Sequence, residues 1–159
     1  MADWLLALIL LYRPDPTPAD AARYVSIASD MAAVVEESGG SDSLALTTLA
    51  IAIHESGLRA EVDDGRERGG GTDVCLMQIR THKKRADQLA ADRRECLRVG
   101  VRLARSSLAA CRARPWTDRL AAYASGRCDA GQTASREIMG IRARLADRLS
   151  FLRRTQDGS

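Results

Sequence analysis

Residues 44–80 read LALTTLAIAIHESGLRAEVDDGRERGGGTDVCLMQIR, and this stretch decides the fold. Its first part is apolar around most of a helical circumference, which predicts a buried helix over residues 43–56. Such a helix has a rigid end and fixes the place of Glu55, with Gly57 as a left-handed cap. The polar, glycine-rich residues 59–73 cannot bury a core, so we expect a surface loop or a short β-ribbon. Residues 76–79 are apolar enough to return inside.

Outside this stretch the apolar periodicity is helical. The expected elements are helices over residues 4–12, 18–37, 119–124 and 133–154, and a long amphipathic segment over residues 86–113. Within that segment, Gly100 leaves room for another part of the chain to approach closely. We find no strand pattern of any length, no repeat and no second domain. The sequence therefore predicts one mainly α domain over residues 1–159.

A chain of 159 residues is long enough to bury roughly 70% of its unfolded surface without a metal or a partner. Charge is distributed unevenly along it: the net charge is −8 over residues 1–79, +8 over residues 80–119 and +3 over residues 120–159. A basic surface favours anionic partners such as bacterial cell-wall polymers or nucleic acid. Solvated, arginine-rich helix faces are the alternative explanation.

The cysteines are Cys75, Cys96, Cys111 and Cys128. They contain no C-x-x-C pair, which disfavours a zinc site, and we expect no metal and no cofactor. Cys96 and Cys111 would lie roughly 22 Å apart on one helix, too far to bond. Two pairings remain, Cys75–Cys96 with Cys111–Cys128 or Cys75–Cys111 with Cys96–Cys128, and we favour the first. Four free buried thiols are the alternative.

The longest apolar run, WLLALILLY at residues 4–12, has nine residues and is too short to span a bilayer. It fits the apolar region of a signal peptide over residues 1–21, with Ala19-Asp20-Ala21 as the A-x-A site, but no Lys or Arg precedes it. A first helix packed on the core is the interpretation that we favour.

A glutamate at the end of an apolar helix is suited to general acid catalysis, because desolvation disfavours its charged form and raises its pKa. On its own, Glu55 would more often be a solvent-facing residue at a helix terminus. The surrounding pattern changes this interpretation.

Four blocks in order resemble the lysozyme-like superfamily, in particular lytic transglycosylases with a soluble-transglycosylase domain. The blocks are AIHESGL at 52–58, DVCLMQI at 73–79, ECLRVGVRL at 95–103 and AYASG at 122–126. In this order, they are similar to four motifs of that family: the helix that ends in E-S, the G-L-M-Q block, the N-x-x-x-G-x-x-x-L helix and the A-Y-N-A-G block. The resemblance implies a lysozyme-like domain with a catalytic core over about residues 41–131.

The resemblance also implies roles for individual residues. Glu55 would be the catalytic acid, Gln78 a sugar ligand, Tyr123 a contact of Glu55, and Met77 a wall of the cleft. Ser56 would belong to the same site, with a role more structural than catalytic. Residues 72–79 also resemble the T-D-Y-G-x-x-Q-I stretch of animal-type lysozymes, in which the aspartate is the second catalytic carboxylate, here Asp73. We assign no catalytic role to His54.

The implied function is cleavage of peptidoglycan glycan strands by lytic transglycosylation or by muramidase hydrolysis, at the bacterial cell wall or in the periplasm. A virion, lysis-dependent release or secretion would deliver the protein, and the first and last of these routes imply a virion or secretion-machine assembly as a partner. Two departures, Cys75 for the usual glycine and Ala124 for the usual asparagine, leave open a non-catalytic peptidoglycan-binding or virion structural protein. A basic nucleic-acid-binding protein is a further alternative, disfavoured by the few aromatic residues and by the placement of Glu55.

Overall fold

The centre of the molecule is helix α3 (Asp42–Ser56), which packs against α2, α6 and α8. Ten of its residues are buried: Ala45, Leu46, Thr47, Thr48, Leu49, Ala50, Ile51, Ala52, Ile53 and Ser56. The hydroxyls of Thr47 and Thr48 donate to carbonyls one turn earlier, so they are buried without an unsatisfied polar atom. The buried helix predicted over residues 43–56 is therefore confirmed.

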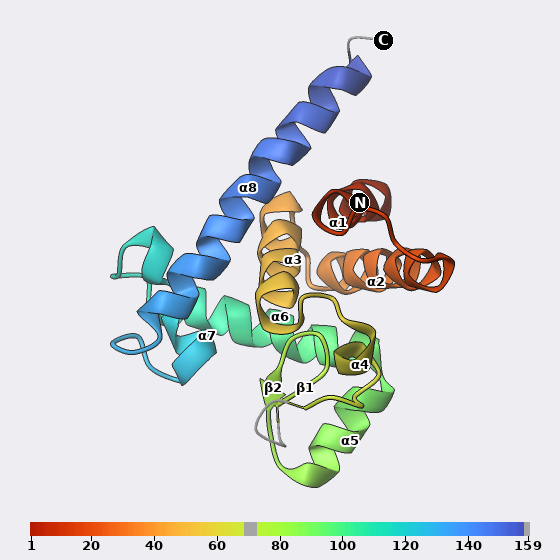
Figure 1. Ribbon diagram of the computed structural model, residues 1–159. Coiled ribbons are helices and arrows are strands. Elements are labelled where there is room, and N and C mark those ends of the chain that lie inside the picture. Colours follow the sequence, from red (N-terminus) through yellow and green to blue (C-terminus); the bar gives the residue numbers. More distant parts are fainter. Residues whose placement is uncertain (69–72, 158–159) are drawn as a thin grey trace.

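The computed structural model describes residues 1–68 and 73–157. The other elements are α1 (Ala2–Tyr12), α2 (Pro18–Glu37), α4 (Ala60–Asp63), β1 (Asp73–Val74), β2 (Ile79–Arg80), α5 (Lys83–Ala91), α6 (Arg93–Ala110), the 3-10 helix η1 (Trp116–Asp118), α7 (Ala121–Ser125) and α8 (Gln132–Asp157) (Figure 1). The prediction of one mainly α domain is confirmed. In its described residues the chain forms eight α-helices and one small antiparallel ribbon.

Helix α1 packs against α2 and α8 and buries Leu5, Leu8 and Ile9, so the first apolar run is a helix on the core, as favoured. Thr17 then starts α2, because its hydroxyl accepts from the backbone N–H of Asp20 at 3.1 Å and Pro18 suits the first helical position. None of the described helices combines the length and apolar character needed to cross a membrane.

The amphipathic segment predicted over residues 86–113 is two helices, not one. Helix α5 ends and α6 begins at Asp92, whose backbone has φ −132° and ψ 96°. The carboxylate of Asp92 accepts from the N–H of Glu95 at 3.0 Å and caps α6. The helix dihedral angles are thus interrupted although the apolar periodicity continues.

The ribbon also lies elsewhere than predicted. Residues 60–63 form the short helix α4, and β1 and β2 pair Asp73 with Arg80 and Val74 with Ile79, so that residues 75–78 form the turn of the ribbon. This turn is closed by left-handed backbone at Cys75 (φ 62°) and Gln78 (φ 46°). Leu76, Met77 and Ile79 are buried, as expected. The part of the predicted loop at residues 69–72 lies outside the described residues.

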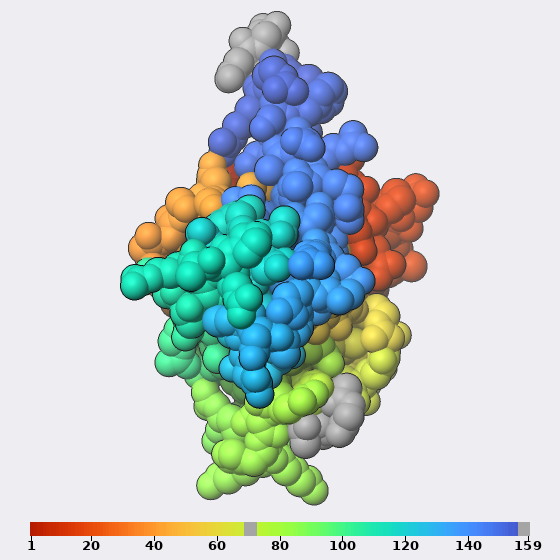
Figure 2. All heavy atoms as spheres, turned by 90° about the vertical axis from the view of Figure 1, so that its left-hand side faces the viewer, coloured from red at the N-terminus to blue at the C-terminus, as the bar shows by residue number. Residues whose placement is uncertain are grey.

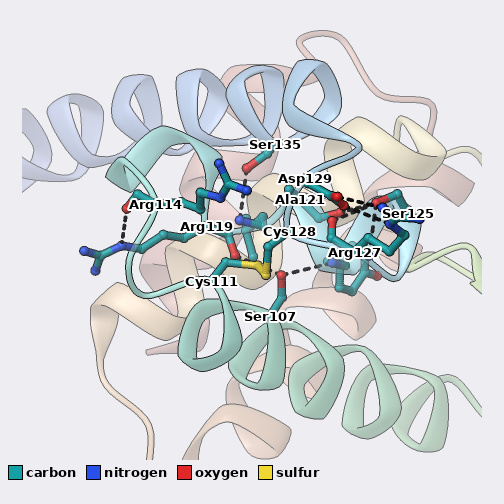
Figure 3. Close-up of a disulfide and its surroundings, with 12 residues drawn as sticks. Ser107, Cys111, Arg114, Arg119, Ala121, Ser125, Arg127, Cys128, Asp129 and Ser135 are labelled. Atoms are coloured by element: carbon teal, nitrogen blue, oxygen red, sulfur yellow. Dashed lines mark hydrogen bonds and ion pairs between the residues drawn. A yellow bond between two sulfur atoms is a disulfide. The ribbon is translucent and has the colours of Figure 1, made fainter.

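Two disulfides, Cys75–Cys96 and Cys111–Cys128, confirm the favoured pairing. The alternative pairing and the free thiols are wrong, because all four cysteines are bonded. The first disulfide ties the turn of the ribbon to α6. The second ties the end of α6 to the loop after α7 (Figure 3).

Helix α8 packs on α3 and η1 through Ile138, Met139, Leu145 and Leu149. Its C-terminal half extends beyond the other helices (Figures 1 and 2). Ser135 at its start is fully buried, where its hydroxyl donates to Thr117 O at 2.7 Å and accepts from Leu120 N at 3.0 Å. This hydroxyl joins α8 to the segment that leads into α7.

Ion pairs between the acidic and the basic part of the chain account for much of the uneven charge. Three arginines of α6 bind carboxylates of α2 and α4; the pairs are Arg93 with Asp63 and Asp30, Arg94 with Asp30, and Arg98 with Glu37. These cations are already neutralised within the fold.

Candidate active site

A cleft of about 530 Å³ lies at the C-terminal end of α3. It is lined by Glu55, Asp73, Gln78, Ile79, Arg80, Leu103, Ala122, Tyr123, Ala124, Ser125 and Gly126. The walls come from the ribbon, from α6 and from α7 with the loop that follows it. Four of the six predicted site residues, Glu55, Asp73, Gln78 and Tyr123, therefore line one cleft.

The position of Glu55 is fixed by the turn that ends α3. Gly57 is left-handed (φ 57°), as predicted, and its N–H donates to Ile53 O at 2.9 Å. Arg13 donates to the carbonyl of Gly57 through Nε at 3.0 Å, and Arg23 donates to the carbonyl of Leu58 at 2.7 Å. Two guanidinium groups thus hold the turn, and Glu55, with 21% of its side chain exposed, faces the cleft from a rigid support.

The imidazole of His54 lies between two carboxylates. Its Nδ1 is 3.3 Å from Glu55 Oε1, and its Nε2 is 2.9 Å from Glu137 Oε2 of α8. The hydrogen bond with Glu55, opposed by desolvation and reinforced by Glu137, raises the pKa of His54 from 6.5 to about 9. His54 is therefore an imidazolium at neutral pH.

This contact was missed by the sequence analysis. The adjacency of His54 and Glu55 was a signal, but the partner that holds the ring, Glu137, is 83 residues from His54 in the chain.

Tyr123 lines the cleft but does not use its hydroxyl to bind Glu55. The hydroxyl donates to the main-chain carbonyl of Met77 at 2.7 Å. Burial and, secondarily, the negative charge of Glu55 raise the pKa of Tyr123 well above its usual value. Tyr123 is thus a neutral phenol that joins α7 to the turn of the ribbon, while its ring stays in the neighbourhood of Glu55.

The turn of the ribbon explains one departure from the resembled pattern. Cys75 stands where a glycine is usual, and its φ of 62° is a conformation that glycine adopts without strain. The disulfide to Cys96 holds the turn at this position. Gln78, which is also left-handed, folds back so that Nε2 donates to Cys75 O at 3.1 Å, and its amide lies at the cleft.

Met77 and Ser56 lie behind the cleft surface. Met77 is 0% exposed and packs on Gly100, where an added Cβ would lie 2.5 Å from Met77 Cε. Ser56 is 2% exposed; its hydroxyl donates to Ala52 O at 2.6 Å and accepts from Leu58 N at 3.1 Å. Neither side chain is accessible to a ligand, because both are buried. Their role in this structure is to place the turn of the ribbon and the end of α3.

Asp73 is paired across the ribbon with Arg80. Arg80 Nε lies 3.0 Å from Asp73 Oδ1, and Nη2 lies 3.2 Å from Oδ2. Asp73 is 18% exposed and Arg80 is 83% exposed, so the pair lies at the open edge of the cleft. An exposed ion pair of this kind contributes little to stability.

Within residues 1–68 and 73–157, no cluster of three or more His, Cys, Asp or Glu side chains has an arrangement suited to a metal ion. The polar side chains at the cleft include two carboxylates, a guanidinium, an amide and a phenol, and the imidazolium of His54 contacts one of the carboxylates. No family model, curated protein or solved structure matches the chain.

Proposed function

We propose that this protein is a peptidoglycan-cleaving glycosidase with a lysozyme-like fold that acts on the β-1,4 bond between N-acetylmuramic acid and N-acetylglucosamine. One observation carries the proposal: Glu55 stands at the clamped end of a buried helix and shares a cleft with Asp73, Gln78 and Tyr123. These residues come from three of the four blocks that resemble lytic transglycosylases. The remaining block, residues 95–103, supplies Gly100. The turn that carries Gln78 packs against this glycine through Met77.

In the proposed reaction, Glu55 gives its carboxyl proton to the glycosidic oxygen. The bond from C1 to that oxygen breaks, and its electron pair goes to the oxygen. Asp73 stabilises the positive charge that develops on the sugar ring, after Arg80 has turned away or become a ligand of the substrate. The amide of Gln78 supplies a hydrogen-bond donor or acceptor for the sugar.

Two endings are compatible with this site. Attack by water gives a reducing end, which is muramidase hydrolysis. Attack by the 6-hydroxyl of the same muramic acid, with Glu55 now accepting its proton, gives a 1,6-anhydro sugar, which is lytic transglycosylation. Asp73 favours the first ending, and the L-M-Q and A-Y blocks favour the second.

The test is clearing of purified sacculi by the wild type and by Glu55→Gln. Removing a general acid is expected to reduce clearing by about 100-fold or more. Glu36→Gln is the matched control, because Glu36 is an exposed residue of α2, a helix that contributes no residue to the cleft lining. Clearing that is unchanged in Glu55→Gln contradicts the assignment of the acid.

A non-catalytic peptidoglycan-binding or virion structural protein is the second candidate. It is favoured by the fact that both cleft carboxylates already have a cationic partner, Glu55 with His54 and Asp73 with Arg80. Wild-type protein that sediments with sacculi and releases no fragments would support it. Salt-dependent binding of DNA without action on sacculi would support a nucleic-acid-binding protein instead.

We place the proposed activity outside the cytoplasm, at the cell wall or in the periplasm. Both disulfides support this location, because disulfides persist in oxidising compartments. Virion delivery, lysis-dependent release and secretion are all compatible with this proposal.

A further inference from the structure

His54 has an acidic side chain in contact with each of its ring nitrogens. A neutral imidazole has one N–H and can donate to only one carboxylate, whereas the other carboxylate would face a nitrogen lone pair. Here both ring nitrogens lie near carboxylate oxygens, at 3.3 Å from Glu55 and 2.9 Å from Glu137. While both acidic groups are ionised, this geometry describes an imidazolium that donates on both sides. When Glu55 carries the proton that it delivers, on Oε2, its Oε1 still accepts from Nδ1–H of His54.

We infer that His54, held by Glu137, is a positioning residue for Glu55, and that the charged form of His54 is the form that supports the reaction. The inference deepens the proposed function and rests on it. Because Nδ1–H of His54 donates to Oε1 of Glu55, Oε2 is left as the oxygen that delivers the proton to the substrate. The Nδ1 proton stays on His54 throughout the step.

The charge of His54 matters most after the proton has left Glu55. At that point Glu55 is a carboxylate, and the imidazolium beside it stabilises the new negative charge without having to move. Glu137 contributes indirectly: it is 60% exposed and lies outside the cleft lining, and its contact is with the far nitrogen of the ring. Helix α8, which lies outside the four resembled blocks, thus supplies a residue that holds His54.

The other ionisable groups around His54 do not reverse this balance. A groove of about 560 Å³ on the side of His54 that faces α1 and α8 is lined by Tyr12, Arg136, Glu137 and Arg144. Arg136 is paired with Asp118, which reduces its effect on the ring. The two carboxylates in direct contact with His54 therefore decide its protonation, in agreement with its raised pKa of about 9.

The experiment combines NMR with kinetics on the same variants. The chain has two histidines, so His54 and His82 can be assigned with His54→Gln and His82→Gln and then titrated separately. We expect the pKa of His54 near 9 in the wild type, and a fall of about one unit or more in Glu137→Gln, because one of two opposite charges is removed. Asp147→Asn, an exposed change on the same helix, is the control and leaves the titration unchanged.

Kinetics then separates a positioning role from a merely structural one. Because Glu137→Gln lowers the pKa of His54, its kcat relative to that of the wild type should fall as the pH rises through the interval between the two His54 pKa values, and the two kcat values should differ little at lower pH, where the ring is charged in both. His54→Gln should lower kcat and kcat/KM by the same factor, as expected for an interaction that matters in the transition state.

Three outcomes overturn the inference, and they are distinguishable. A pKa near 6.5 for His54 in the wild type would show that Glu55 and Glu137 do not hold the ring in its charged form. A ratio of Glu137→Gln to wild-type kcat that does not change with pH, although the pKa of His54 differs between the two proteins, removes the positioning role. A wild type that shows the raised pKa but does not cleave sacculi overturns the proposed function, and the positioning role falls with it.

Discussion

Replacing Gly100 with alanine adds a methyl group where the side chain of Met77 already lies. The added Cβ would be 2.5 Å from Met77 Cε, 2.7 Å from Cγ and 3.0 Å from Cβ. The flexible end of the side chain can move away, but its Cβ is attached to the turn that carries Gln78. Overpacking of this kind costs about 1–3 kcal/mol.

The helix propensity of alanine offsets part of that cost, by about 0.5–1 kcal/mol. Gly140→Ala measures this offset alone, because Gly140 is also inside a helix and its nearest neighbour is Arg144 Nη1 at 3.7 Å. We therefore expect Gly100→Ala to be less stable than Gly140→Ala by about 1–3 kcal/mol. For a chain of this length, each kcal/mol corresponds to about 2–4 °C in Tm.

Urea unfolding followed by circular dichroism, with both disulfides intact, gives the two free energies. A double-mutant cycle with Met77→Ala adds a second test, because the shorter side chain relieves the overlap and the two changes should be non-additive by about 0.5 kcal/mol or more. Equal stabilities of Gly100→Ala and Gly140→Ala, or strict additivity with Met77→Ala, would refute the packing of the ribbon turn on α6.

Three further predictions concern charge and cross-links. Asp63→Ala should cost about 1–3 kcal/mol, because the side chain of Asp63 is 1% exposed and its loss leaves Arg93 with only Asp30 and Ser26 as partners; Asp64→Ala, which removes an exposed pair with Arg66, should cost less than Asp63→Ala, and equal urea midpoints would speak against the difference. The contribution of His54 to stability should be complete below pH 6.5 and disappear as the pH rises through about 9, because its pKa is raised in the folded state; the loss is on the order of 1–3 kcal/mol, and His54→Gln should flatten this part of the stability profile. Removing the Cys75–Cys96 disulfide, which spans 21 residues, by a double change to serine should cost about 3 kcal/mol; a melting temperature equal to that of the oxidised wild type would contradict this.

Local signals predicted the parts of the fold that depend on a single segment. The buried helix before Gly57 follows from an apolar circumference and a glycine cap, and both are confirmed. The break at Asp92 also had a local signal, an aspartate three residues before Glu95, as in a capping box. The continuing apolar periodicity masked it, because residues on both sides of the break face the core.

Contacts between distant segments set the limits of the sequence analysis. The pairing of Asp73 with Arg80 depends on the register of the ribbon, and the contact of His54 with Glu137 depends on the packing of α8 on α3. The resemblance predicted that Glu55, Gln78 and Tyr123 share one cleft, as they do. It did not indicate that the hydroxyl of Tyr123 would bind the carbonyl of Met77. Residue type predicts which groups a site contains, whereas packing decides which atoms they contact.

The central proposal, cleavage of glycan strands with Glu55 as the acid, is tested most directly by mass spectrometry of the fragments released from purified sacculi. We predict that the wild type releases disaccharide-peptides with either reducing or 1,6-anhydro ends, which differ in mass by one water. Glu55→Gln should release neither kind of fragment. Glu36→Gln should release the same fragments as the wild type, in the same amount. Sacculi left intact by the folded, disulfide-bonded wild type, or identical fragments from Glu55→Gln, would contradict the proposal.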